Sequence, residues 1–395
     1  MNKAFEGKSK KSIYLDSNAT TPVDQQVLSA MLPFFTDYFG NPSSRSHAYG
    51  WEAEAGIQTA RETIATAINA EPNEIIFTSG ATEANNLAIK GVAESYMHSG
   101  RHIVTVQTEH SAVLNPCRYL ETLGFEVTYL PVTSEGLIEL SELDKAVRAD
   151  TILVSVMAAN NEIGVLQPLK EVGELCDRRG VLFHTDAAQA LGKVSLDVQA
   201  MHIGLMSLTA HKLYGPKGIG ALYVSRKQPR VQLSAQLHGG GQEKGLRSGT
   251  LYTPQIVGFG EAARIAVDTM EHEQKRLLEL RDRLSKHLLS IPGIYLNGHA
   301  TQRLSNNLNI SIEGIDINAL LSSIRHTVAL STGSACSSAN PQPSHVIKAL
   351  GRSDALARAT LRFGLGRSTT VEEIDIVKEA VAEGVRSLRT RRASE

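Results

Sequence analysis

The chain has 395 residues, of which 42% are hydrophobic, and a formal net charge of −1 at pH 7. A nearly neutral chain has no overall field to recruit nucleic acid or an acidic membrane surface, so neither is expected as a direct partner. Its three cysteines are widely spaced and fit neither a disulfide framework nor a paired metal motif, which favours a reducing compartment.

The two ends and the apolar runs give no sign of a targeting or membrane segment. Residues 1–11 lack the apolar stretch of a signal peptide, and no run approaches the roughly 18 apolar residues of a membrane span. We therefore expect a soluble protein of the cytoplasm.

Short apolar runs alternate with segments of helical period along the first part of the chain. The predicted strands cover 74–78, 102–106, 126–130, 151–157, 181–183 and 219–224, and the predicted helices between them include 83–97, 112–123 and 169–179. Such alternation is typical of the α/β class, with a mostly parallel sheet covered by helices on both faces.

A long helical stretch over 253–289 leads into a second part of the chain. There, strands at 307–312, 326–330 and 360–364 and a helix over 371–388 predict a smaller α/β unit that the N-terminal segment joins. We expect a large domain over 20–262 and a small domain formed by 1–19 and 263–395.

Polar or reactive groups follow four of these predicted strands, at 79–82, 109–110, 160–161 and Asp186, and a fifth strand end is expected at the apolar run that ends in His211-Lys212. Ligands of parallel α/β sheets bind beyond the carboxyl ends of the strands. These residues are therefore expected to meet in one site.

Lys212 ends an apolar run in His211-Lys212 and precedes a glycine-punctuated turn. A lysine partly stripped of water favours its neutral amine, which is a nucleophile for aldehydes. Asp186, at the end of another apolar strand, could hold a pyridinium nitrogen. Together they predict pyridoxal phosphate as the cofactor.

The other candidates each have a structural alternative. The turn Ser79-Gly-Ala-Thr82 could bring a helix N-terminus to phosphate, or Thr82 could simply cap that helix. His110, taken to end the strand through 105–109, could stack on a pyridine ring and move protons, or serve the fold. Asn160 and Asn161 could bind a phenolic oxygen or a carboxylate, or form a turn.

Two further candidates lie later in the chain. The glycine-rich loop over 238–250 could bring Thr250 to phosphate. Arg362 lies inside an apolar strand, so its guanidinium needs an anion, which is either a substrate carboxylate or an internal carboxylate.

Metal and dinucleotide sites are not expected. His98 and His102 straddle Ser99-Gly100 and do not form a helical metal pair. No Gly-x-Gly-x-x-Gly opens a helix after the first strand, which disfavours a dinucleotide.

Cys336 lies among small and turn-forming residues, which predicts a mobile, exposed loop at about 331–345 with one thiol. Such a thiol can attack an external electrophile, provided that thiolate is populated. Cys117 and Cys176 lie in helical apolar settings and are interpreted as small buried hydrophobic residues.

Taken together, these motifs resemble the cysteine desulfurases of the IscS/NifS type in the class V aminotransferase family. The resemblance runs from about residue 13 to residue 388 and rests on 14–22 (YLDSNATTP), 40–47, 79–83 (SGATE), 108–110 (TEH), 160–164 (NNEIG), 211–212, 247–250 (RSGT) and 333–337 (GSACS).

The resemblance implies the type I fold of pyridoxal-phosphate-dependent transferases, with a mostly parallel seven-stranded sheet and a smaller C-terminal domain. It implies that Lys212 forms a Schiff base with the cofactor, Asp186 faces the ring nitrogen, Gln189 contacts the ring oxygen and His110 stacks on the ring and moves protons. By the same resemblance, the phosphate side is held by Ala81, Thr82, Thr209, Ala210 and His211, with Thr250 coming from the partner subunit of a homodimer.

For the substrate, the resemblance implies that Asn161 and Arg362 bind the carboxylate end of L-cysteine and that Cys336 takes the sulfur as a persulfide. L-Alanine would be released and the sulfur passed to an acceptor protein. The alternatives are a selenocysteine lyase and a class V aminotransferase. Iron–sulfur cluster assembly, tRNA thiolation and DNA phosphorothioation all remain open as destinations of the sulfur.

Overall fold

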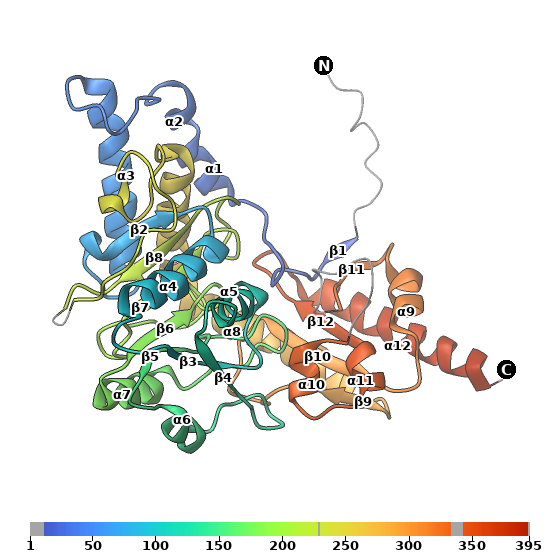
Figure 1. The fold of residues 1–395 in the computed structure, drawn as a ribbon. Coiled ribbons are helices and arrows are strands. Elements are labelled where there is room, and N and C mark those ends of the chain that lie inside the picture. The colour runs from blue at the N-terminus through green and yellow to red at the C-terminus, as the bar shows by residue number, and fades with distance from the viewer. Residues whose placement is uncertain (1–11, 228–229, 333–342, 394–395) are drawn as a thin grey trace.

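The computed structural model describes residues 12–227, 230–332 and 343–393. Its elements gather around one large sheet and two small ones (Figure 1).

The large sheet has seven strands in the order β2-β8-β7-β6-β5-β3-β4. All neighbouring pairs are parallel except those of β8, which runs against both β2 and β7. The predicted α/β class and mostly parallel seven-stranded sheet are therefore confirmed. The strands are β2 (Ile75–Thr78), β3 (His102–Val106), β4 (Glu126–Leu130), β5 (Thr151–Ser155), β6 (Leu182–Asp186), β7 (Leu205–Thr209) and β8 (Gly220–Val224).

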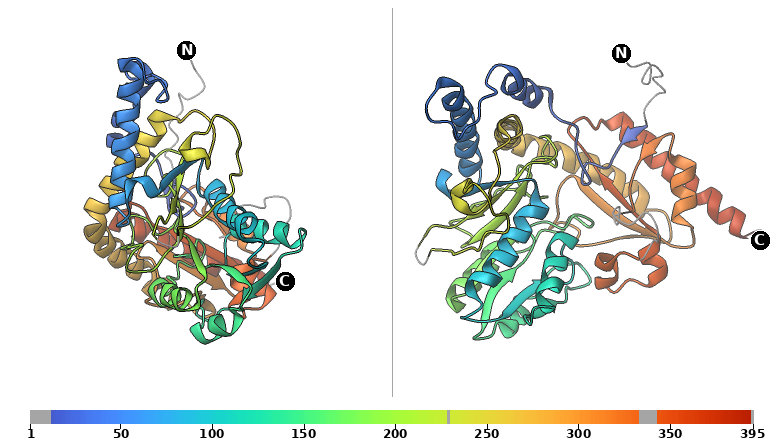
Figure 2. Two further views of the ribbon diagram at one scale, coloured as in Figure 1. Left: turned by 60° about the vertical axis from the view of Figure 1, so that its left-hand side comes forward. Right: turned by 45° about the horizontal axis from the view of Figure 1, so that its top comes forward.

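Helices cover both faces of this sheet, because successive side chains of a buried strand point to opposite sides. On β2, for example, Ile76 packs into the core under α4 (Ala81–Tyr96) and α5 (Ser111–Glu121), whereas Phe77 packs into the core on the other face. The left view of Figure 2 shows α4 and α5 on one side of the sheet and α3 and α8 on the other. The second face carries α3 (Ala48–Thr66), α7 (Leu169–Arg179) and part of α8 (Thr253–Leu289).

A smaller antiparallel sheet, in the order β12-β10-β9, forms the base of a second core. Beside it, β1 near the N-terminus pairs in parallel with β11. The elements of this part are β1 (Ile13–Tyr14), β9 (Ile294–Leu296), β10 (Asn307–Ile312), α9 (Ile317–Ile324), β11 (Val328–Ala329), α10 (His345–Ala349), α11 (Asp354–Arg358), β12 (Thr360–Gly364) and α12 (Val371–Ala393).

Helix α8 connects the two cores. Its first half buries residues such as Phe259 and Ala263 against the large sheet, and its second half buries Leu284 and Leu288 in the second core. The remaining elements are the short helices α1 (Gln25–Met31), α2 (Pro33–Thr36) and α6 (Leu140–Ala146) and the 3₁₀ turns η2 (Pro72–Glu74) and η3 (Glu243–Gly245). Within the described ranges, no helix combines the length and apolar character needed to cross a membrane.

One local prediction was wrong. The strand predicted over 102–106 is confirmed as β3, but its expected continuation through residues 105–109 to His110 is not formed, because the chain turns after Val106 and Glu109 N–H donates to the carbonyl oxygen of Val106 at 3.2 Å. His110 therefore caps helix α5 instead of ending a strand.

Gly220 of β8 packs directly against the turn that follows β2. A Cβ atom there would lie 2.4 Å from the carbonyl oxygen of Leu208 and 2.7 Å from Cα of Gly80. We expect Gly220→Ala to lower the free energy of unfolding by about 1–3 kcal/mol, because both neighbours are backbone atoms that cannot rotate away.

Urea unfolding measures the effect of this change. Gly204→Ala is the matched control, since its Cβ would meet its nearest neighbour, the carbonyl oxygen of Phe183, only at 3.3 Å. Equal losses in the two variants would contradict the close packing of β8 on Gly80.

Candidate active site

A large cavity opens at the edge of the sheet where the parallel strands end, and it has about 480 Å³ of space open to the centre of a water molecule. Ten of the predicted site residues line it: Ala81, Thr82, His110, Asn161, Asp186, Gln189, Thr209, His211, Lys212 and Arg362. The strand ends therefore converge on one site, as the sequence predicts.

The N-terminus of the 16-residue helix α4 forms one end of the cavity. Gly80 caps this helix with φ +151°, a conformation that side chains rarely adopt, and the alternative role of Thr82 as the cap is thereby excluded. The first N–H groups of a helix have no partner inside the helix, so this end of the cavity suits an anion such as phosphate.

Asp186 ends β6 and is buried beside the cavity, with 6% of its surface exposed. Its carboxylate accepts hydrogen bonds from Asn85 Nδ2 at 2.7 Å and from the backbone N–H of Ala188 at 2.9 Å. These amide donors orient the carboxylate but bring no compensating positive charge. A buried carboxylate with such partners suits a cationic group on a ligand.

His110 lines the cavity as the cap of α5, and its Nδ1 accepts from the backbone N–H of Ala112 at 3.1 Å. Burial lowers the pKa of His110 below its usual value, and the charges of Lys212 and His345 lower it further, against the opposite effect of Asp186. The ring therefore favours its neutral form, and its orientation is fixed by a backbone contact.

His211 and Lys212 follow β7, and both line the cavity. Burial, together with the nearby Lys212, lowers the pKa of His211 to about 4. Its Nδ1 lies 3.1 Å from Thr20 Oγ1, and its carbonyl oxygen accepts from Thr21 Oγ1 at 3.0 Å. The N-terminal segment thus holds the backbone just before Lys212.

The two asparagines after β5 have different roles. Asn160 is buried and forms the turn, since its Oδ1 accepts from the N–H groups of Glu162 and Ile163. Asn161 lines the cavity. The interpretation as a turn residue is therefore correct for Asn160, whereas the side chain of Asn161 remains available to a ligand.

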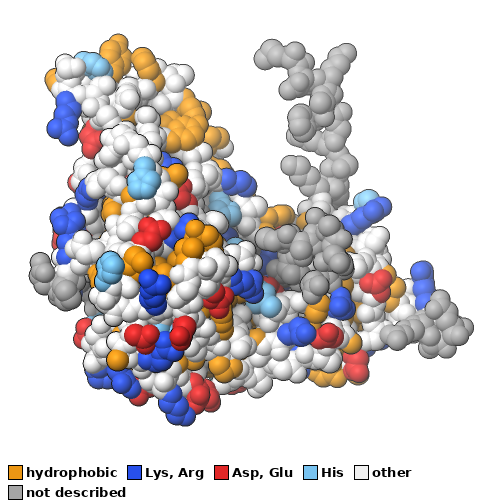
Figure 3. Space-filling view, viewed as in Figure 1, with side chains coloured by type: hydrophobic (Ala, Val, Ile, Leu, Met, Phe, Trp, Pro, Cys, Tyr) orange, Lys and Arg blue, Asp and Glu red, His pale blue; other side chains and the backbone are white. Residues whose placement is uncertain are grey.

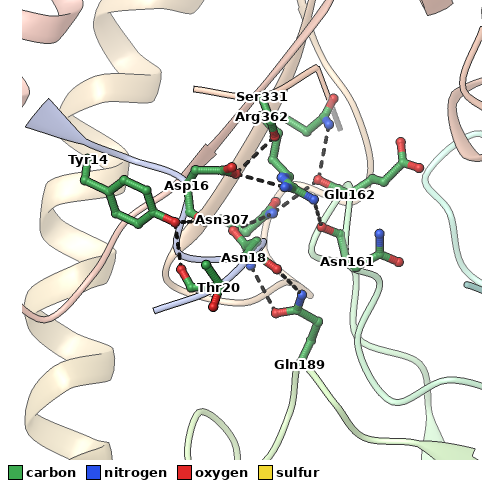
Figure 4. Close-up of polar contacts among 11 residues, drawn as sticks. Tyr14, Asp16, Asn18, Thr20, Asn161, Glu162, Gln189, Asn307, Ser331 and Arg362 are labelled. Carbon is green, nitrogen blue, oxygen red and sulfur yellow. Dashed lines mark hydrogen bonds and ion pairs between the residues drawn. The ribbon is translucent and has the colours of Figure 1, made fainter. Parts of the chain in front are cut away.

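Arg362 is 3% exposed and lies on β12 at the side of the cavity that the smaller sheet contributes. Figure 4 shows its guanidinium between Asp16 and Asn161: Nη2 lies 2.9 Å from Asp16 Oδ1, and Nη1 donates to the carbonyl oxygen of Asn161 at 2.9 Å. Ser331 Oγ donates to the same Asp16 oxygen at 3.0 Å. The internal ion pair considered as the alternative is therefore present.

The pairing with Asp16 does not use all the donors of Arg362. Within the described residues, its buried Nε–H has no hydrogen-bond partner. An unsatisfied buried donor is costly, so the guanidinium is not fully compensated by its partners in the described residues.

Three predicted residues do not line the cavity. Ala210 is fully buried behind it, and Thr250 lies on the exposed surface. Cys336, with residues 333–342, lies outside the described residues. Cys117 and Cys176 are buried as predicted, and burial raises the pKa of each thiol to about 12.

Several residues of the site were not predicted from the sequence. Asn18 and Thr20 line the cavity from the N-terminal segment, and Asp16 holds Arg362. Glu109, by contrast, was expected in the site from its place beside His110, but it does not line the cavity. It is fully buried, and within the described residues its Oε2 has no partner.

The comparisons with known proteins agree with this geometry. Residues 13–377 match the family described as aminotransferase class-V. The chain is 54% identical over 378 residues to the cysteine desulfurase IscS of Methylobacillus flagellatus, which covers 95% of this chain and 93% of the relative.

Two solved structures extend the comparison. A NifS-like protein aligns with a TM-score of 0.89 and 38% identity, covering 95% of this chain and 100% of the other. A structure described as SspA in complex with cysteine aligns with a TM-score of 0.79 and 40% identity, covering 90% and 99%. The chain belongs to the class V aminotransferases and, within them, to the IscS/NifS type of cysteine desulfurase. This family depends on pyridoxal phosphate.

Glu109→Gln is expected to remove a stability penalty at alkaline pH. Burial raises the pKa of the Glu109 carboxyl well above its usual 4.5, so the folded protein holds a proton there that the unfolded chain releases. The stability that this bound proton contributes is complete below pH 4.5. It declines as the pH rises towards the pKa of Glu109 in the folded protein. Glutamine has no such proton to lose.

The stability of Glu109→Gln relative to the unchanged protein should therefore increase by about 1 kcal/mol or more between pH 5 and pH 8. Urea unfolding of both proteins at these two pH values measures the difference. A constant difference across the range would show that Glu109 is ionised in the folded protein.

Proposed function

We propose that this protein is a cysteine desulfurase that converts L-cysteine to L-alanine and carries the released sulfur as a persulfide on Cys336. The observation that supports it best is the convergence of Asp186, Lys212 and Arg362 on one cavity in a chain of this family. These groups suit a cofactor ring, its aldehyde and an amino-acid carboxylate, respectively.

The residues of the cavity fit pyridoxal phosphate. Asp186, with amide partners, would face the ring nitrogen, and His110 would stack on the ring. Ala81, Thr82, Thr209 and His211 line the end of the cavity that suits the phosphate, and Ala210 would support that side from behind. When bound, the cofactor supplies a sink for the electron pair of the substrate Cα–H bond.

Lys212 would hold the aldehyde carbon of the cofactor and, once displaced by substrate, take the Cα proton with its amine. His110 favours its neutral form, so it can accept a proton and return it during the release of alanine. Gln189 would donate to the ring oxygen, and its position in the cavity supports this role.

The carboxylate of the substrate would bind Arg362 and Asn161. Asp16 already occupies Nη2 of Arg362, so the substrate would use the donors of the guanidinium that remain on the cavity side. Asp16 would in this way keep the buried cation compensated when no substrate is bound.

Cys336 would complete the reaction. Its thiolate attacks the substrate sulfur, so that an S–S bond forms while the Cβ–S bond breaks, and the carbon skeleton leaves as alanine after protonation. The persulfide would then be passed to an acceptor protein. The similarity to a structure with bound cysteine supports cysteine as the substrate.

A homodimer is part of this proposal. Figure 3 shows hydrophobic side chains gathered over α1–α3 at the top of the molecule, and those exposed in this region include Leu32, Phe35, Phe39, Tyr49 and Trp51. A patch of this kind is typical of a protein interface. It supports a second copy docking here, with the exposed Thr250 reaching the phosphate site of its partner.

Two further parts of the proposal concern the division of the chain into domains and the cellular compartment in which the protein acts. We propose a division into a large and a small domain, and the packing of α8 supports a boundary inside the helix between Ala266 and Leu277, a few residues after the boundary at 262–263 predicted from the sequence. We also propose the cytoplasm as the place of action.

Cys336→Ser is expected to keep the cofactor but to lower alanine release from cysteine by at least about 100-fold, because a hydroxyl cannot accept the sulfur. Cys176→Ala is the control and should retain activity, since this thiol is buried in the core. The assay quantifies alanine and keto acid together. Undiminished alanine from Cys336→Ser would refute the persulfide role, and keto acid as the main product would identify an aminotransferase.

The shared site of the homodimer predicts complementation between two inactive variants. Thr250→Asp would repel phosphate in the partner's site, and Lys212→Ala removes the amine from its own site. When the two variants are co-expressed, half of the dimers are mixed and each mixed dimer has one intact site, so about a quarter of the normal activity should return. A mixture no more active than either variant alone would contradict the shared site.

A further inference from the structure

Lys193 lies in the turn that follows β6 and has no role in the reaction described above. Its Nζ donates to Gln189 Oε1 at 3.1 Å, and its carbonyl oxygen accepts from Gln274 Nε2 of α8 at 2.6 Å. The lysine is therefore held at both its backbone and its amino group.

The contact with Lys193 completes a fixed arrangement around the amide of Gln189. Besides Lys193, Asn18 Nδ2 donates to Gln189 Oε1 at 3.3 Å, and Gln189 Nε2 donates to the carbonyl oxygen of Asn18 at 2.8 Å (Figure 4). The backbone carbonyl of Asn18 can only accept, so its contact identifies the amide nitrogen and hence the orientation of the whole group. The group that Gln189 can offer to the large cavity is the second hydrogen of Nε2.

Lys193 also lies close to Lys212. Both residues line a second, smaller cavity, with about 40 Å³ of space open to the centre of a water molecule. Burial lowers the pKa of Lys193 to about 7, and the charge of Lys212 contributes to the shift. Since the interaction between two charges is mutual, a proton on Lys193 disfavours a proton on the amine of Lys212.

We propose that Lys193 is a positioning residue: it fixes the Gln189 amide with an N–H directed to the ring oxygen of pyridoxal phosphate and places a positive charge behind Lys212. This inference rests on the proposed function, because it needs the cofactor in the large cavity. The other titratable groups that line the small cavity are Tyr214, Glu273 and Arg367, and His211 is also close enough for its pKa to be affected by Lys193.

Two substitutions separate the hydrogen bond of Lys193 from its charge. Lys193→Met removes both and keeps a long unbranched side chain, whereas Lys193→Gln keeps an N–H donor without the charge. Lys170→Met on α7 is the matched control, because Lys170 lies on the exposed surface of that helix.

The first measurement is the affinity of the full-length protein for pyridoxal phosphate, determined by titration after the cofactor has been removed. We expect Lys193→Met to raise Kd about tenfold or more, as for the loss of a charge-assisted hydrogen bond, and Lys193→Gln to raise it less. Lys170→Met should bind as the unchanged protein does. Thermal unfolding without the cofactor shows whether each variant is folded.

The second measurement is the pH at which the absorbance of the bound cofactor changes. Removal of a nearby positive charge favours the protonated form, so both Lys193 variants should shift this pH upward by about half a unit to one unit. A residue that only supported the fold would leave this pH unchanged.

The third measurement tests whether Lys193 acts through Gln189. In a Gln189→Ala protein, the further change Lys193→Met should have little additional effect on Kd, because the amide that it orients is already gone. Full additivity of the two changes would overturn the proposed coupling, and unchanged Kd and absorbance in folded Lys193→Met and Lys193→Gln would overturn the role of Lys193. If the unchanged protein failed to bind pyridoxal phosphate, the proposed function itself would be wrong.

Discussion

The direction of the strands is the constraint on which the site depends. Six of the seven strands of the large sheet run the same way, so the loops that follow them meet at one edge. The helix N-terminus after β2, His110 after β3, Asp186 on β6 and Lys212 after β7 come from distant parts of the sequence and face one cavity for this reason alone. Such an edge suits a cofactor that must be held at its ring, its phosphate and its aldehyde at the same time.

The smaller sheet and the N-terminal segment complete what the large sheet cannot provide. Arg362 enters the cavity from β12, and it is held by Asp16, which lies 346 positions away in the sequence. The same carboxylate oxygen accepts from Ser331, which precedes the segment that contains Cys336. Arg362 and the residue from which the cysteine segment begins are thus tied to one side chain.

The sequence predicts the parts of this structure that depend on local patterns. Buried parallel strands are continuous apolar runs, so their positions and the polar residues after them could be recognised. The bounds of β3 were predicted correctly, but His110 was wrongly taken to end a strand because residues 107–109 continue a strand-like pattern after the chain has turned. Thr82 and Asn160 were ambiguous, because a cap, a turn and a binding residue use the same side chains.

What the sequence could not predict depends on contacts between distant segments. Asp16 and Asn18 belong to the motif over 14–22 that carries the resemblance, but neither this motif nor the sequence around Lys193 indicates which residue of the site each one meets, since polar side chains in turns are usually exposed. The ion pair of Arg362 was foreseen only as one of two possibilities. Its partner became identifiable when β1, β11 and β12 were seen side by side.

Burial also determines which charges remain in the cavity. It disfavours the charged forms of His110, His211 and Glu109, so three titratable groups beside the ligand site favour their neutral forms. An ion pair that is itself buried, such as that of Arg362 with Asp16, is screened less than one on the surface. An anionic ligand that reaches Arg362 and the N-terminus of α4 would therefore be held by a small number of fixed groups, and its orientation would follow from their positions on two different sheets.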